Sequence, residues 1–81
     1  MYLRETWAVS TGRIIEFFER QADAEVTAEG IRCRNCRITL TELPSRELGP
    51  IEIPRTLVEM SGDDTEQIYR RFFFRFISAG G

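Results

Sequence analysis

The stretch AEVTAEGIRCRNCRITLTEL, residues 24–43, decides the fold of this chain. Apolar and polar residues alternate along it, as they do in strands that bury one face of a sheet. A two-residue turn at Glu29-Gly30 supplies the glycine that tight hairpins prefer, and it pairs Val26 with Cys33. The apolar partners then share one face, and a slip by one residue would destroy this sorting. The stretch therefore predicts an antiparallel hairpin.

The alternation changes phase at Arg34-Asn35. Beyond these two residues the buried positions pass to Cys36, Ile38 and Leu40. One extra residue in a strand shifts the phase by one position, so we expect a β-bulge at Arg34-Asn35.

Two other segments have the helical period. Residues 13–22 follow an N-cap signal at Ser10, and residues 64–77 follow Asp63, with Glu66 completing a capping box. The apolar arc of the first segment contains Ile14, Ile15, Phe17, Phe18 and Ala22. That of the second contains Ile68, Tyr69, Phe72, Phe73, Phe76 and Ile77. The aromatic content of the second segment also suits a strand, which leaves a last strand over 66–77 as the alternative.

Three shorter segments complete the chain. Residues 2–9 alternate weakly and predict a short strand or an ordered N-terminal arm. Residues 44–50, PSRELGP, predict a loop because they contain two prolines and a glycine. Residues 51–60 predict a further strand in which Pro54 lies at an edge or a bend, because proline cannot donate to the ladder.

These elements predict a single α+β domain over residues 1–81. An N-terminal amphipathic helix packs on a small antiparallel sheet of three to five strands, and the C-terminal segment is a helix. With 66–77 as a last strand, the order of a helix followed by a meander resembles Sm-like and SH3-like small β-barrels. Sm-like proteins form rings and often bind RNA, which that resemblance would imply here.

The composition excludes several kinds of chemistry. The chain has no histidine and no lysine, so all 11 basic residues are arginine. Histidine bases, histidine metal ligands, Schiff-base lysines and the phosphate-binding lysine of a P-loop are therefore absent. We expect a non-enzymatic protein without a cofactor.

Cys33 and Cys36 form a C-x-x-C motif. Two such pairs from two subunits could make a four-cysteine zinc site in a dimer, and a C-x-x-C at a helix start could be redox-active. Strand pattern continues on both sides here, so we favour two small buried thiols beside the bulge.

Arginines flank both cysteines. Arg32, Arg34 and Arg37 are expected on the solvent face of the sheet, where they could contact the phosphates of a nucleic acid. We favour the simpler interpretation that Arg34 pairs with Glu25 across the hairpin.

The C-terminal segment is the candidate interaction site. Burial of most of its rings is worth roughly 1.5–3 kcal/mol each, so only Phe74 is expected to stay exposed, among Arg70, Arg71 and Arg75. The favoured function is a small interaction module that self-associates through these residues. The alternative is nucleic-acid binding by the same residues together with the sheet arginines.

No apolar run reaches the roughly 18 residues that a membrane helix needs, and the N-terminus lacks a signal-peptide pattern. We expect a cytoplasmic protein that forms homo-oligomers and does not enter a membrane.

Overall fold

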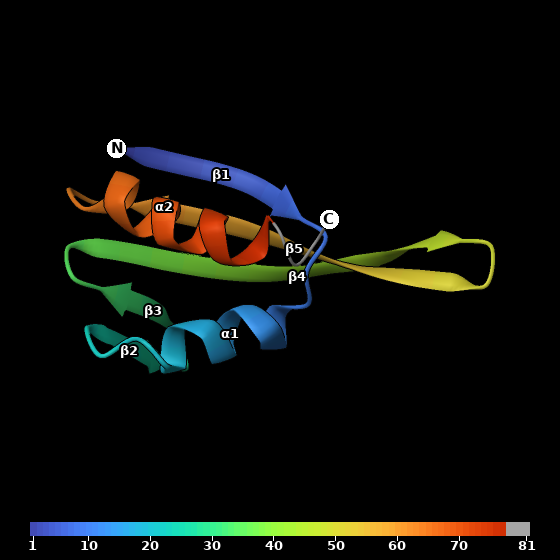
Figure 1. The fold of residues 1–81 in the computed structure, drawn as a ribbon, viewed down its shortest axis with the longest axis horizontal. Coiled ribbons are helices and arrows are strands. Elements are labelled where there is room, and N and C mark those ends of the chain that lie inside the picture. Colours follow the sequence, from blue (N-terminus) through green and yellow to red (C-terminus); the bar gives the residue numbers. More distant parts are fainter. Residues whose placement is uncertain (78–81) are drawn as a thin grey trace.

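The computed structural model describes residues 1–77 and shows two helices packed on one face of a five-stranded antiparallel sheet (Figure 1). Its elements are β1 Tyr2–Trp7, α1 Thr11–Glu19, β2 Ala24–Thr27, β3 Gly30–Cys33, β4 Cys36–Leu48, β5 Ile51–Ser61 and α2 Thr65–Phe76. The strand order β1-β5-β4-β3-β2 leaves β1 and β2 at opposite edges. The prediction of an α+β domain with three to five strands is confirmed. The barrel alternative is wrong, because the last segment is a helix and the sheet is open.

The core lies between the sheet and the two helices. The buried apolar side chains are Val9, Ile14, Phe18, Ile31, Cys33, Cys36, Ile38, Val58, Met60, Ile68, Phe72 and Phe76. Phe18 of α1 and Phe72 of α2 stack with ring centroids 6.5 Å apart, and Phe17 meets Phe76 edge to face at 5.6 Å. The two helices therefore pack against each other as well as against the sheet.

The predicted hairpin forms, but its register is different. The turn is Ala28-Glu29, so Val26 faces Ile31 and Ala24 faces Cys33. The observed register differs by two residues from the predicted one. A shift of two keeps every side chain on its predicted face, because side chains alternate with a period of two.

The predicted β-bulge at Arg34-Asn35 is wrong. These residues are the two-residue turn between β3 and β4, with Cys33 directly opposite Cys36. A two-residue turn shifts the alternation of buried and exposed residues by one position, as a bulge does. The reason is that Cys33 and Cys36, on either side of the turn, are cross-strand partners and point to the same face. Gly62 lies against this turn, and a Cβ on Gly62 would be 2.0 Å from the Asn35 carbonyl oxygen.

Residues 44–50 are not a loop. They belong to a long hairpin in which β4 continues to Leu48 and β5 begins at Ile51. We call residues 43–55 the arm, because they extend beyond the other strands (Figure 1). The ladder shifts register between Leu43 and Arg46, so Pro44 and Pro54 lie where the ladder is irregular, and Pro50 lies in the turn between Leu48 and Ile51. Pro54 was expected at an edge or a bend, and it lies at an edge, because β1 pairs with β5 only from Thr56 onward.

The helices begin and end slightly differently from the prediction. The first covers 11–19 instead of 13–22, with Ser10 as its N-cap residue. The N-cap residue of α2 is Asp64 and not Asp63, and its carboxylate makes no capping hydrogen bond. It accepts one from the Asn35 N–H at 2.9 Å, while the Asn35 carbonyl accepts one from the Asp64 N–H at 3.2 Å. The start of α2 is therefore fixed by the β3–β4 turn.

Candidate interaction surfaces

One row of exposed side chains runs along α2 on the side away from the core. It consists of Glu66, Arg70, Phe74 and Ile77, spaced by three or four residues, and we call it the α2 ridge. Side chains at this spacing lie on one face of a helix. Phe74 is 68% exposed and Ile77 is 48% exposed. The ridge therefore presents two large apolar groups to water.

The charged end of the ridge is internally paired. Arg70 donates a hydrogen bond to Glu66 at 3.3 Å, an i,i+4 ion pair. At the apolar end the half-buried Phe73 ring meets the Phe74 ring edge to face at 6.0 Å. The ridge thus has an ion pair toward its N-terminal end and an apolar group toward its C-terminal end.

The structure separates the four residues predicted for interaction. Phe74 and Arg70 lie on the ridge. Arg75 is exposed beside it, with its guanidinium 5.2 Å from the centre of the Phe76 ring. Arg71 turns toward the sheet and binds Asp23. Arg71 is therefore a structural contact and is not presented by α2.

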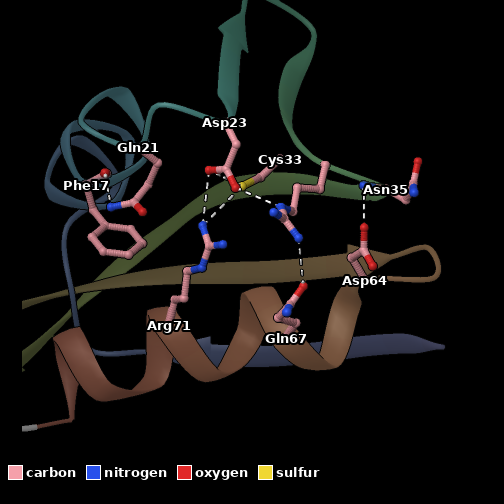
Figure 2. Close-up of polar contacts among 9 residues, drawn as sticks. Phe17, Gln21, Asp23, Cys33, Asn35, Asp64, Gln67 and Arg71 are labelled. Carbon is pink, nitrogen blue, oxygen red and sulfur yellow. Dashed lines mark hydrogen bonds and ion pairs between the residues drawn. The ribbon is translucent and has the colours of Figure 1, made fainter.

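Asp23 is the centre of a polar cluster between α2 and the sheet (Figure 2). Its carboxylate accepts hydrogen bonds from Arg71 at 3.1 Å and from Arg34 at 3.0 Å, and the Cys33 thiol lies 3.5 Å away as a third donor. The hydrogen bond from Arg71 is the main cause that lowers the pKa of Asp23 to about 2. Arg34 also donates to Gln67 of α2 at 3.4 Å. The sequence gives no signal for Asp23, because its partners are far apart in the chain.

Arg34 occupies an unusual backbone conformation. Its φ is +55°, a region that costs a residue with a side chain about 1 kcal/mol or more. Its contacts with Asp23 and Gln67 offset this strain. Arg34 therefore points to the helix side of the turn, and the predicted pair with Glu25 is wrong.

The two thiols are unsuited to nucleophilic chemistry. Both side chains are buried in the core, and burial is the main cause that raises the pKa of Cys33 to about 11 and also raises the pKa of Cys36. A zinc site shared between subunits would need both thiols at the surface, so this geometry does not favour that hypothesis. Within residues 1–77 no three Cys, Asp or Glu side chains gather as metal ligands.

The other two arginines of the predicted sheet stripe do come together. Arg32 and Arg37 are cross-strand partners in β3 and β4, and both are exposed. They lie on the sheet face that the helices do not cover. Arg34 does not join them, because it belongs to the turn.

A scan against protein-family models finds no match for this chain, and a search of the curated proteins finds no relative. None of the helices that the structure describes is long and apolar enough to cross a membrane.

Proposed function

We propose that the protein is a small non-enzymatic interaction module that self-associates through the α2 ridge. The observation that supports this most is the exposure of Phe74 beside the buried Phe72 and Phe76. A phenylalanine left in water forgoes roughly 1.5–3 kcal/mol of burial, which is a large amount for so small a domain. Exposed aromatic and arginine side chains are the residues that most often dominate protein interfaces.

A second copy of the chain fits this ridge because the ridge is self-complementary. In an antiparallel pair of α2 helices, Phe74 of one copy lies near Arg70 and Glu66 of the other. The contact repeats itself through a twofold axis, as in most homodimers. The Phe74 ring can then stack on the Arg70 guanidinium, and the two helix dipoles oppose each other favourably.

The expected dimer is weak. A stable interface buries about 1,200–2,000 Å² in total, and one ridge of a three-turn helix offers less. Association should therefore depend on protein concentration in the micromolar range. We further propose that the protein acts in the cytoplasm, where two free thiols stay reduced.

The experiment is sedimentation velocity over a range of concentrations up to tens of micromolar. The wild type is expected to change from monomer to dimer, and Phe74→Glu to remain a monomer. Leu48→Glu is the matched control, because Leu48 is also half exposed but lies at the tip of the arm. A wild-type monomer at all concentrations would refute the proposal. Dissociation by Leu48→Glu but not by Phe74→Glu would assign the contact to the arm instead.

A further inference from the structure

The sheet has one face without helices, which we call the open face. Thr56, Val58 and Met60 of β5 are buried under the helices, so the residues that alternate with them point to the opposite side. The pairing register extends this assignment to the neighbouring strands. The arginines on the open face are Arg4, Arg32, Arg37, Arg46 and Arg55.

The structure sorts the 11 arginines of the chain into two groups. The six that lie elsewhere all have a partner within the molecule. Arg20, Arg34, Arg70 and Arg71 form ion pairs, and Arg13 and Arg75 lie over the Phe76 ring. Among residues 1–77, none of the five arginines on the open face has a carboxylate within 4.0 Å or an aromatic ring beneath its guanidinium. The unpartnered positive charge is therefore concentrated on one surface.

The open face has a charge opposite to that of the whole chain. At the strand positions of this face five arginines stand against Glu25 and Glu59, a net charge of +3, whereas the chain as a whole has −2. The turn residues Glu29 and Asp63 line the hollows beside Arg32 and Arg37. Glu59 also accepts a hydrogen bond from the Tyr2 hydroxyl at 2.6 Å. The average charge of the molecule thus conceals a basic surface.

Arg32 and Arg37 are neighbouring positive charges on the open face. They are direct cross-strand partners, and like charges in this position destabilise a sheet because the Cβ atoms are only about 5 Å apart. Glu25, opposite Arg32 on the other side, forms no ion pair with it. An anion between the two guanidinium groups would remove this repulsion.

The arginines form an elongated track. From Arg37 to Arg46 the strand β4 extends about 30 Å at roughly 3.3 Å per residue, and Arg55 lies on the neighbouring strand. Thr39 and Thr41 lie between these arginines on the same face and can donate hydrogen bonds. A flexible chain with regularly spaced negative charges matches such a track.

We propose that the open face binds single-stranded nucleic acid through its phosphates. Guanidinium groups bind phosphate oxygens in pairs of hydrogen bonds, which suits a surface whose only cations are arginines. The strand neighbours of Arg32 and Arg37 on this face are Glu25, Thr27, Thr39 and Ser61, so the apolar anchor of a typical protein interface is missing there. Tyr2 is 62% exposed at the edge of this face, where a base can stack on its ring.

This mode of binding should be sequence-tolerant and sensitive to salt. Contacts to phosphates carry no sequence information. Each phosphate neutralised on a single strand contributes about −0.7 to the slope of log K against log salt, so five contacts give about −3.5. At about 25 mM salt, loss of one such contact weakens binding roughly tenfold.

The experiment is a titration of fluorescein-labelled oligouridylate with the protein, followed by fluorescence anisotropy at several salt concentrations. Arg37→Gln and Arg32→Gln are each expected to weaken binding roughly tenfold at about 25 mM salt and to reduce the slope by about 0.7. Arg20→Gln is the matched control, because it removes the same charge from the exposed side of α1. It should bind as the wild type does. Circular dichroism checks that each variant is folded.

Three results would overturn the proposal. The first is no binding by the wild type at low salt. The second is equal weakening by Arg37→Gln and Arg20→Gln, which would indicate general charge attraction. The third is a polyglutamate peptide that competes as well as the oligonucleotide, which would indicate an acidic protein partner. Phe74→Glu should bind the oligonucleotide normally, so this proposal and that of self-association can fail separately.

Discussion

Arg71 donates a hydrogen bond to Asp23 at 3.1 Å, although 48 positions separate the two residues in the chain. Asp23 comes directly before β2, and Arg71 lies in the middle of α2. The same carboxylate also binds Arg34 at the β3–β4 turn. One side chain thus joins the last helix to the hairpin of β2 and β3.

The first prediction concerns the dependence of stability on pH. The pKa of Asp23 falls from 3.8 to about 2 on folding, mainly because of the hydrogen bond from Arg71. A carboxyl with a lowered pKa stabilises the fold above its unfolded pKa, and this contribution is lost as the pH falls from about 4 to 2. Asp23→Asn should lower the melting temperature at pH 7 and make the melting temperature less sensitive to pH in this window.

The control is Glu16→Gln, which removes an exposed i,i+4 ion pair with Arg20. Such pairs contribute only about 0.3–0.5 kcal/mol, so the melting temperature should hardly change. An equal effect of the two substitutions would contradict a special role for Asp23.

The second prediction compares two glycines. Gly62 has a φ of +122°, and an added Cβ would lie 2.0 Å from the Asn35 carbonyl oxygen. Gly62→Ala should therefore lower the free energy of unfolding by at least about 2 kcal/mol. Gly12 in α1 has no atom within 4 Å of an added Cβ, so Gly12→Ala should raise it by about 0.5–1 kcal/mol. Urea unfolding measures both, and a neutral Gly62→Ala would show that the turn can move away.

The sequence predicted the kinds of elements better than their connections. Alternation assigned Val26 and Cys33 correctly to the buried face, but registers that differ by two residues bury the same side chains. The pattern therefore could not distinguish the observed turn, Ala28-Glu29, from the predicted one. A tight turn and a bulge at Arg34-Asn35 also shift the alternation of buried and exposed residues by the same one position. Prolines led us to expect a loop at 44–50, although an irregular ladder can accommodate them.

The surfaces were predictable only where the helical period was clear. Phe74 was expected to be exposed because it falls on the arginine side of the helix, and it is. The roles of Asp23 and Arg71 depend on contacts between distant segments, which periodicity does not contain. Arg4 joins the open face through the register of β1 with β5, and Arg55 through the register of β5 with β4. Both registers are visible only in the structure.

The third prediction separates the core rings from the exposed ring. Phe72 is fully buried between Trp7 and Phe18, with the Trp7 ring centroid at 4.8 Å. Phe72→Ala should lower the free energy of unfolding by about 3–5 kcal/mol because it leaves a cavity. Phe74→Ala should change it by no more than about 0.5 kcal/mol in the monomer. Chemical denaturation at low protein concentration tests both, and a large loss in Phe74→Ala would show that its ring packs on the fold.

The fourth prediction concerns the reactivity of Cys33. Its pKa of about 11 leaves roughly 0.1% thiolate at pH 8, and the side chain is buried. A thiol-specific disulfide reagent should react with the native protein only as fast as the fold opens, and at once in denaturant. The raised pKa also makes the stability depend on pH. The contribution of the Cys33 thiol to the free energy of unfolding is fully present below pH 9 and is lost between about pH 9 and 11, because the thiol of the unfolded chain ionises first. Rapid labelling of the native protein at pH 8 would contradict the buried position.

The fifth prediction is that the body folds without the arm. No residue of 43–55 is buried, and a two-stranded ribbon in water contributes little stability of its own. Thr56, the first buried residue after the arm, donates to the Val9 carbonyl at 2.7 Å, so its contacts lie within the body. Joining Glu42 to Thr56 through Asn-Gly, a favoured hairpin turn, should keep the circular dichroism spectrum typical of the fold and change the free energy of unfolding by no more than about 1 kcal/mol.

The same deletion also tests the open face. It removes Arg46 and Arg55 but leaves Arg32 and Arg37 in place, so the slope of log K against log salt should become shallower by about 1.4 and binding should persist. A folded variant with an unchanged slope would show that the track ends before the arm. An unfolded variant would show that the arm stabilises the sheet, because its two strands are continuations of β4 and β5.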